Sequence, residues 1–332
     1  MAYIDNYKKY LDEIPTDIEI CKETDRRIVF GYTSDLDVLL TYNEEEFNKL
    51  IDANVKGDIY RDGDEDITDM ESFSRIIAYY MANGLGGEAD ITDKKVVDYL
   101  LEHFEHTFAL GGTAAQGAAA MASVGMPLIA HISDKSEEVC DLMDYEGLNA
   151  IVGEHQVPIR EIHTGEPVYH VVFSYTKGDS FVLHGKRYEV PISNRVILDY
   201  DTIHKDIVVK DDFKNYLEQH TDQLISYNVS GFNGIIDTDL VSRRMKELGV
   251  HYKKVKEKNP DCLIYFESAH YISQEVKKIV YREIASYVDI MGMNEEELVA
   301  HMKELDFEPD KENLNDVLKS MAVLTEKYHV RG

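Results

Sequence analysis

The chain has 332 residues, 44% of them hydrophobic and 30% charged, a composition typical of a globular protein with room for one large and one smaller domain. Its formal net charge of −28 excludes nucleic acid and anionic lipid as partners, because an acidic surface repels both. No apolar stretch is long enough to span a membrane, and the first residues, MAYIDNYKKYLDEIP, lack the apolar core of a secretory signal.

Cysteine and histidine spacing argues against a disulfide framework or a zinc site. Cys21, Cys140 and Cys262 lie far apart in the sequence and form no CxxC pair, which predicts a cytoplasmic protein. The histidines form no HExxH or similar pattern, so we assign structural roles to His163, His170, His184 and His270.

The N-terminal part predicts a helix followed by a buried strand. Residues 1–26 are polar with a few apolar side chains on one face, and Ile28–Gly31 forms the strand. A polar turn containing Asp35 and Asp37 comes next. Open α/β sheets bind ligands at the carboxyl ends of their strands, so this turn is a candidate binding loop. The alternative is that both aspartates only cap a turn.

Two helices are predicted in the next segment. Thr68 and Glu71 form a capping-box pattern ahead of a helix that ends at Gly84. Residues 94–105 predict the second helix.

The run FALGGTAAQGAAAMASVG indicates a loop that enters a closely packed helix. Gly111 and Gly112 allow the backbone to approach a ligand, because glycine has no Cβ. The alternative is that they only allow close helix–sheet packing. Residues 126–133 predict a short strand.

The second half combines a β-rich segment with alternating strands and helices. Residues 167–198 alternate apolar and polar side chains and predict an antiparallel hairpin or meander. Beyond residue 220, the apolar runs QLISYNVSG, DCLIYFES and YVDIMGMN are separated by helices near 238–248 and 273–285 and followed by the helix EEELVAHMKEL. This βαβα rhythm predicts a parallel sheet.

Six short motifs occur in a characteristic order. They are Asp37 in GYTSDLD, Gly111 and Gly112 in GGTAA, Asn194–Arg195, Ser230–Asn233 in the sequence SGFN, Glu267 in YFESAH, and Asn294 with Glu297 in GMNEEEL. In this order they resemble the ADP-dependent glucokinase/phosphofructokinase family of ribokinase-like sugar kinases, over roughly residues 27 to 300.

The resemblance implies a ribokinase-like, three-layer α/β/α main domain with a smaller α+β lid domain. The expected main domain comprises residues 1–54, 102–160 and 200–332, and the expected lid comprises 55–101 and 161–199.

The resemblance also implies an ADP-dependent kinase that transfers a phosphoryl group to a sugar hydroxyl. The residues expected to bind the sugar are Asp35, Asp37, Glu88, Gly111, Gly112 and Asn233. A carboxylate at Glu88, and a second one at Asp35, would repel a phosphorylated sugar, which favours a glucose-like substrate over fructose 6-phosphate. The alternative for Glu88 is an exposed loop residue.

Nucleotide and magnesium contacts are expected at two other places. Arg195 would pair with a nucleotide phosphate and Asn294 would contribute to the same site, whereas Glu267 and Glu297 would hold Mg²⁺. The alternatives are a surface ion pair for Arg195 and simple helix capping for Asn294. We expect Asp37, Glu267 and Glu297 to meet around one crevice.

The chain departs from the family pattern at two important points. Tyr265 stands where the family has histidine two residues before the carboxylate. No Gly-x-Gly-Asp turn, which would supply the catalytic base, occurs after Asn294. The GDSF sequence that begins at Gly178 lies between two β segments and indicates a hairpin turn, so no catalytic residue is identified.

Two other functions remain open. The chain could be a non-catalytic homologue that binds sugar or nucleotide, with the final catalytic segment missing. It could also be an ATP-dependent ribokinase-type sugar or nucleoside kinase, although the long β insert and GMNEEEL favour the ADP-dependent branch.

Overall fold

The computed structural model describes residues 2–332 and divides into two compact units, each with its own sheet and core. The larger unit comprises the chain up to Ser34, Gly112–Gly165 and Ile203–Gly332, and the smaller unit comprises Asp35–Gly111 and Glu166–Thr202. The chain therefore passes from one unit to the other four times. The predicted α/β class is confirmed.

The unit boundaries differ from those predicted from the sequence. Residues 35–54 and 102–111 belong to the smaller unit, not to the main domain. The reason is strand pairing: β2 (Asp35–Leu40) pairs with β4 (His106–Gly111) and β8 (Tyr169–Tyr175) in the smaller sheet.

The larger unit is built on a seven-stranded sheet in which every neighbouring pair except the last is parallel. In spatial order the strands are β14 (Ile290–Gly292), β13 (Leu263–Glu267), β12 (Leu224–Val229), β1 (Arg27–Gly31), β5 (Leu128–Ala130), β6 (Leu148–Val152) and β7 (His155–Pro158). The order of the strands reverses at β1, so this is a doubly wound sheet with a switch point next to its central strand.

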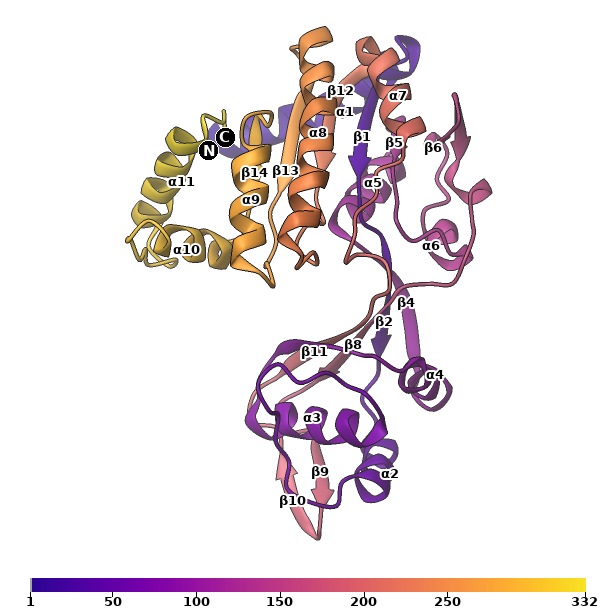
Figure 1. Ribbon diagram of the computed structural model, residues 1–332, viewed down its shortest axis with the longest axis vertical. Coiled ribbons are helices and arrows are strands. Elements are labelled where there is room, and N and C mark those ends of the chain that lie inside the picture. Colours follow the sequence, from indigo (N-terminus) through magenta and orange to yellow (C-terminus); the bar gives the residue numbers. More distant parts are fainter. Residues whose placement is uncertain (1) are drawn as a thin grey trace. The chain divides into compact units, whose positions relative to one another are not determined.

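Helices cover both faces of this sheet (Figure 1). Val29 on β1 belongs to the core shared with α7, α8 and α9, whereas its neighbour Phe30 faces Gly117 on α5. Successive strand residues point to opposite faces, so this pair alone indicates three layers. The helices are α1 (Ala2–Glu23), α5 (Thr113–Ser123), α6 (Glu137–Leu142), α7 (Asp211–Gln219), α8 (Thr238–Lys258), α9 (Gln274–Ile284), α10 (Glu295–Lys303) and α11 (Leu314–Tyr328).

The smaller unit has a five-stranded mixed sheet with three helices. In spatial order its strands are β3 (Gly87–Asp90), β11 (Asn194–Tyr200), β8, β2 and β4, and its helices are α2 (Glu44–Asn54), α3 (Met70–Asn83) and α4 (Lys94–His103). The predicted β meander is split: β8 and β11 pair in this sheet, whereas β9 (Ser180–Leu183) and β10 (Lys186–Glu189) form a separate hairpin.

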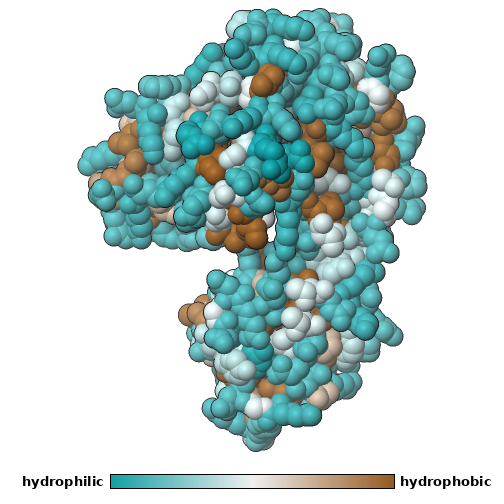
Figure 2. Space-filling view, viewed as in Figure 1, coloured by the Kyte–Doolittle hydropathy of each residue, from teal (hydrophilic) through white to brown (hydrophobic). Residues whose placement is uncertain are grey.

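The surface accords with the composition. Hydrophilic side chains cover most of the face drawn in Figure 2, with hydrophobic side chains scattered among them. In the described part of the chain, every helix is too short or too polar to cross a bilayer.

The cap of α3 lies one residue later than the sequence pattern predicts. Asp69, not Thr68, is the N-cap: its side chain accepts a hydrogen bond from the Ser72 backbone N–H at 2.9 Å, and the Ser72 side chain caps in return. A carboxylate stabilises the start of a helix more than a threonine hydroxyl does, because the positive end of the helix dipole attracts its negative charge. The predicted stop at Gly84 is confirmed, since this residue ends the helix in the left-handed conformation.

Replacing Asp69 by alanine is expected to lower the free energy of unfolding by about 1 kcal/mol, because the first turn of α3 loses its cap. The hydrogen bond from Ser72 lowers the pKa of this carboxyl, which agrees with stabilisation of its charged form. Urea denaturation measures the loss. Asp66→Ala is the matched control, because Asp66 is exposed and lies outside the cap. An equal loss in both variants would contradict this role.

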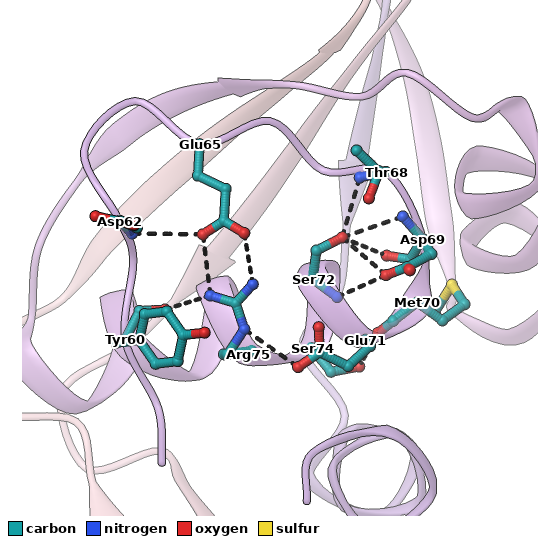
Figure 3. A network of polar contacts seen from close by, with 10 residues as sticks. All are labelled: Tyr60, Asp62, Glu65, Thr68, Asp69, Met70, Glu71, Ser72, Ser74 and Arg75. Atoms are coloured by element: carbon teal, nitrogen blue, oxygen red, sulfur yellow. Dashed lines mark hydrogen bonds and ion pairs between the residues drawn. The ribbon is translucent and has the colours of Figure 1, made fainter. Parts of the chain in front are cut away.

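Arg75 anchors α3 to the preceding loop (Figure 3). Its guanidinium makes two hydrogen bonds with Glu65, at 2.6 and 3.0 Å, a third with Glu71 at 3.2 Å and a fourth with the Tyr60 carbonyl oxygen at 2.9 Å. The side chain is only 6% exposed, so these partners compensate a charge that has lost its water.

Candidate functional site

The two aspartates of the first motif lie within a strand, not in a turn after β1 as the sequence suggested. Asp35 and Asp37 belong to β2, the first element of the smaller unit. The alternation in DLDVLL explains this, because Leu36 and Val38 enter the core while both aspartates point to the other face.

Strand register aligns four ionisable side chains across the smaller sheet. Asp37 is opposite His170 on β8, His170 is opposite Asp199 on β11, and Asp199 is opposite Asp90 on β3. We call Asp37, His170, Asp199 and Asp90 the acidic row. Glu88 lies two residues before Asp90 on β3 and therefore shares its face of the sheet.

His170 is held by carboxylates on three sides. Its Nδ1 lies 2.9 Å from Asp35 Oδ1 and 3.8 Å from Asp199 Oδ1, and its Nε2 lies 3.7 Å from Asp201 Oδ2. Burial disfavours the charged ring, but these carboxylates outweigh burial and raise the pKa of His170 well above its usual value. The carboxylates therefore favour the imidazolium form of the ring.

The carboxyl groups of the row are harder to ionise than usual. Burial, with repulsion from Asp35, raises the pKa of Asp37 to about 6. Burial, with repulsion from Glu88, Asp201 and Asp90, raises the pKa of Asp199 to about 7. Near neutral pH this face therefore offers both hydrogen-bond donors and acceptors, which suits a ligand rich in hydroxyl groups.

Arg195 is the cation on the same face. It lies on β11 four residues before Asp199, so alternation directs both side chains to one side of the sheet. Its side chain is exposed, and its charge opposes the rise in the pKa of Asp37. The structure thus brings Arg195 and the predicted sugar-binding carboxylates together within the smaller unit.

Close packing within the protein accounts for both glycines of the GGTAA motif. A Cβ at Gly111 would collide with the Asp35 carboxylate, and one at Gly112 would lie 2.5 Å from the Thr33 carbonyl oxygen. Gly112 also has a φ of 82° and is the N-cap residue of α5. Gly111 therefore leaves room for Asp35, and Gly112 allows the loop to enter the helix, as predicted.

In the larger unit, Glu267 is the last residue of β13. The Tyr265 hydroxyl donates a hydrogen bond to this carboxylate, so the tyrosine that replaces the family's histidine still contacts the acid. Gly292 ends the neighbouring strand β14, where a Cβ would collide with both side chains. A side chain at this position would therefore displace the Tyr265–Glu267 pair.

Asn294 and Glu297 form a reciprocal capping box at the start of α10. Asn294 Oδ1 accepts from the Glu297 N–H at 2.8 Å, and Glu297 accepts from the Asn294 N–H at 3.2 Å. Burial and the negative charge of Glu267 raise the pKa of Glu297. Two mutually repelling, partly buried carboxylates, one at the end of β13 and one in the first turn of α10, suit a divalent cation such as Mg²⁺. The capping alternative is thus correct and compatible with metal binding.

Asn233 lies just after β12 in the SGFN turn. Gly231 has a φ of 94°, and a Cβ there would collide with the Thr33 side chain. Phe232 is buried, while Asn233 is partly exposed. The turn therefore packs against the segment after β1 and leaves the amide of Asn233 accessible.

The predicted site residues fall into two groups. Asp35, Asp37, Glu88, Gly111 and Arg195 lie in the smaller unit, and Gly112, Asn233, Glu267, Asn294 and Glu297 lie in the larger unit. The negative charge of Glu267 contributes to the raised pKa of Glu297, whereas a shared metal site remains a prediction. The single crevice that would also include Asp37 remains a prediction.

His170 and Asp199 were not selected from the sequence. The assignment of His170 to a purely structural role is incomplete, because this residue lies between Asp37 and Asp199 in the acidic row and its ring also contacts Asp35. The sequence feature that could have identified His170 is its position in PVYHVVFSY, where an ionisable ring interrupts an otherwise apolar strand. Asp199 similarly ends the apolar run RVIL.

Comparison with known proteins identifies relatives along most of the chain. Residues 26–330 match the family model described as "ADP-specific Phosphofructokinase/Glucokinase conserved region". The ADP-specific phosphofructokinase of Pyrococcus horikoshii is 24% identical over 290 residues, which cover 82% of this chain and 63% of that protein. The chain thus spans less than two thirds of the length of this relative.

Two solved structures share the fold. A phosphofructokinase from Pyrococcus horikoshii with AMP has a TM-score of 0.74 and 20% identity, covering 92% of this chain and 72% of its own. The last common ancestor of ADP-dependent phosphofructokinases from Methanosarcinales has a TM-score of 0.75 and 18% identity, covering 98% and 72%.

Proposed function

This chain belongs to the ADP-specific phosphofructokinase/glucokinase family, and we propose that it serves phosphoryl transfer from ADP to a sugar hydroxyl. The observation that carries the proposal is the match of the family model to residues 26–330. Phosphoryl transfer requires positioned charges more than covalent chemistry, so the proposed site consists of carboxylates, a metal ion and few cations.

We propose a glucose-like sugar as the acceptor. The acidic row, with Asp35 and Glu88 beside it, supports this choice. A phosphorylated sugar would bring further negative charge towards these carboxylates. A sugar hydroxyl can instead donate to a carboxylate and accept from the His170 imidazolium.

Fructose 6-phosphate is the second candidate acceptor. The relatives compared above are phosphofructokinases, and Arg195 supplies a guanidinium that could bind a phosphate on the same face. The acidic row weighs against this candidate. The relative binding of the two sugars decides between them.

Glu267 and Glu297 are the residues that would hold Mg²⁺, which would supply positive charge to offset the negative charge of the ADP phosphates. The chain's own contribution is positioning: Tyr265 holds the Glu267 carboxylate by a hydrogen bond, and Asn294 holds Glu297. We also propose that Asn294 and Arg195 contribute to nucleotide binding. A cytoplasmic location accords with three buried thiols, Cys21, Cys140 and Cys262.

The 332-residue chain is expected to bind ADP and sugar but to show negligible phosphoryl transfer. No Gly-x-Gly-Asp occurs in the sequence, and a positioned base contributes about 10²–10⁴-fold to such a rate. The Gly178–Asp179 pair is an unsuitable substitute, because Asp179 accepts from the Thr176 N–H at 2.7 Å within a turn.

Melting temperatures and a coupled assay test this expectation. ADP with Mg²⁺ should raise the melting temperature more than ATP, and glucose more than fructose 6-phosphate. A larger shift with ATP would favour an ATP-dependent kinase, and binding without turnover accords with a non-catalytic role for this chain. Clear turnover of ADP and glucose would refute the expected lack of a base.

Replacing Glu267 by glutamine is expected to weaken Mg²⁺-dependent ADP binding about tenfold or more, because one of two metal ligands loses its charge. Isothermal titration with and without Mg²⁺ measures the effect. Glu295→Gln is the matched control, because Glu295 is an exposed acid in the first turn of α10. Unchanged Mg²⁺ dependence in Glu267→Gln would contradict the role of Glu267 as a metal ligand.

A further inference from the structure

A cavity lies in the larger unit, apart from the proposed kinase residues. Its volume is about 700 Å³, and it is lined by one side of α9, by the C-terminal ends of α8, α10 and α11, and by residues 285–289, which precede β14. Glu267, Asn294 and Glu297 do not line it; they lie at the carboxyl ends of the strands and at the first turn of α10. A cavity of this size holds a small organic molecule.

The cavity is basic, although the chain carries a net charge of −28. Asp289 and Glu304 are the acidic residues that line it. The cations around it are Lys256, Lys277, Lys278, Arg282 and Lys327. Five cations face two lining carboxylates, and Arg282 also pairs with the neighbouring Glu283 at 2.7 Å, so two unpaired positive charges remain to attract anions.

Two of these cations are available to a ligand. Lys256 pairs with Asp289 at 2.8 Å, and Lys277 pairs with Glu304 at 2.9 Å. Lys278 and Lys327 are exposed, and among residues 2–332 neither forms an ion pair. These two ion pairs neutralise Asp289 and Glu304, so the unpaired positive charge of the cavity resides on Lys278 and Lys327.

His301 adds a buried polar atom without a partner. Its side chain is 2% exposed, and Nε2 lies 2.6 Å from the Tyr328 hydroxyl oxygen. Within the described chain, Nδ1 is buried and forms no hydrogen bond. Burial and the charge of Lys277 lower the pKa of His301 to about 4, so the ring is neutral at pH 7. When Tyr328 donates to Nε2, Nδ1 carries a proton that lacks an acceptor, which is costly in a folded protein.

We propose that this cavity binds a small phosphorylated molecule with at least two negative charges. Lys278 and Lys327 would pair with its phosphoryl oxygens, and His301 Nδ1–H would donate to one of them. The rings of Tyr281, Tyr287 and Tyr328 also line the cavity and offer contact area to an organic portion. The site is independent of the proposed kinase function.

Titration with inorganic pyrophosphate in the absence of Mg²⁺ tests the proposal. The intact chain should bind one pyrophosphate, and Lys278→Ala and Lys327→Ala should each weaken binding about tenfold, the effect of losing one charge-assisted hydrogen bond. Lys319→Ala and Lys253→Ala are the controls, because both lysines are exposed on α11 and α8 and do not line the cavity. Equal weakening in the controls, or no binding at all, would overturn the proposal.

Two further measurements locate the site. Pyridoxal 5′-phosphate forms an imine with a lysine amine, with loss of water, and borohydride reduces the imine to a stable adduct that mass spectrometry can map. Adducts at Lys278 or Lys327 that pyrophosphate suppresses are expected; adducts that are insensitive to pyrophosphate would contradict the assignment. Glu267→Gln should leave pyrophosphate binding unchanged, whereas a parallel loss would place the anion at the proposed kinase site instead.

Discussion

Replacing Glu65 by alanine is expected to lower the free energy of unfolding by about 3–5 kcal/mol, because it leaves the buried Arg75 guanidinium without its bidentate partner. The Arg75 side chain is 6% exposed, and its closest contact to Glu65 is 2.6 Å. A guanidinium remains charged at any ordinary pH, so it cannot escape the cost of burial by losing a proton. Glu71 and the Tyr60 carbonyl oxygen would compensate only part of the charge.

Urea denaturation of three variants separates this effect from a general loss of surface charge. Glu71→Ala removes the other acidic partner of Arg75, but Glu71 is 51% exposed, so its loss should cost less than about 1 kcal/mol. The double variant Glu65→Leu/Arg75→Met removes both buried charges and should recover much of the lost stability. Similar losses for Glu65→Ala and Glu71→Ala would refute the argument.

Raising the pH from 5 to 8 is expected to destabilise the smaller unit by about 3 kcal/mol, the opposite of the usual trend for carboxylates. The pKa of Asp199 is about 7 and that of Asp37 about 6 in the folded state, against about 4 when unfolded. The folded state therefore holds more protons than the unfolded state between pH 4 and 7. Stability is highest below this window and is lost as the pH rises through it.

His170 changes stability in the same direction at higher pH. Its pKa is raised above the unfolded value of about 6.5, so its contribution is fully present below that value. The contribution is lost as the pH rises through the folded pKa. The figure of about 3 kcal/mol is below the roughly 4 kcal/mol that Asp199 and Asp37 would contribute independently between pH 5 and 8, because the groups interact and are partly solvated.

The larger unit should show the opposite trend. Burial lowers the pKa of His131 to about 3 and that of His301 to about 4, so both rings fold in the neutral form. Their stabilisation is present above the unfolded pKa of about 6.5 and is lost as the pH falls towards the folded values. Acidification from pH 8 to 5 therefore destabilises the larger unit.

Hydrogen exchange, corrected for the intrinsic pH dependence of the exchange rate, distinguishes the two units. Amides of β8 and β11 should be better protected at pH 5 than at pH 8, and amides of β12 and β13 should be better protected at pH 8. In Asp199→Asn the pH dependence of β8 and β11 should become weaker. A common trend in all four strands would contradict the assigned proton uptake.

The sequence predicted best where each element buries a continuous apolar run. Strands β12, β13 and β14 and the helices between them lie where the sequence predicted. Each could be recognised within its own segment, for example from the apolar runs LISYNV and LIYFE and the polar residues that flank them. Helix α8 was predicted near 238–248 but extends to Lys258. Tyr252 and Val255 continue its buried face beyond Gly249, which interrupts the pattern without breaking the helix.

Sheet membership was harder to predict, because it depends on partners that are distant in the sequence. RIVFG and DLDVLL are separated only by YTS, yet they enter different sheets. Nothing in the hydrophobic pattern of β2 specifies that its partner is β8. The lid boundaries were therefore misplaced, although the existence of a second, β-rich unit followed from the alternation in residues 167–198.

The residues of the candidate site also differ in how well the sequence predicted them. The positions of Glu267 at the end of β13 and of Glu297 in the first turn of α10, just after β14, followed from the order of parallel strands, whereas their metal binding stays a prediction. Only Asp37 of the acidic row was predicted, from a recognisable motif, whereas His170 and Asp199 acquire their role through cross-strand register. Their pKa values follow from burial and neighbouring charges, which no single segment of sequence specifies.

The repeated passage of the chain between the two units has a consequence for its synthesis. β2 is complete at Leu40 but cannot pair with β8 until Tyr175 has emerged, and β1 likewise waits for β12. β4 and β5 can pair with β2 and β1 earlier, but at ~5–20 residues per second the other edge of β2 stays unpaired for roughly 7–27 seconds. Ribosome-bound fragments ending before residue 169 should therefore be sensitive to proteolysis in both units and should require chaperones to remain unaggregated.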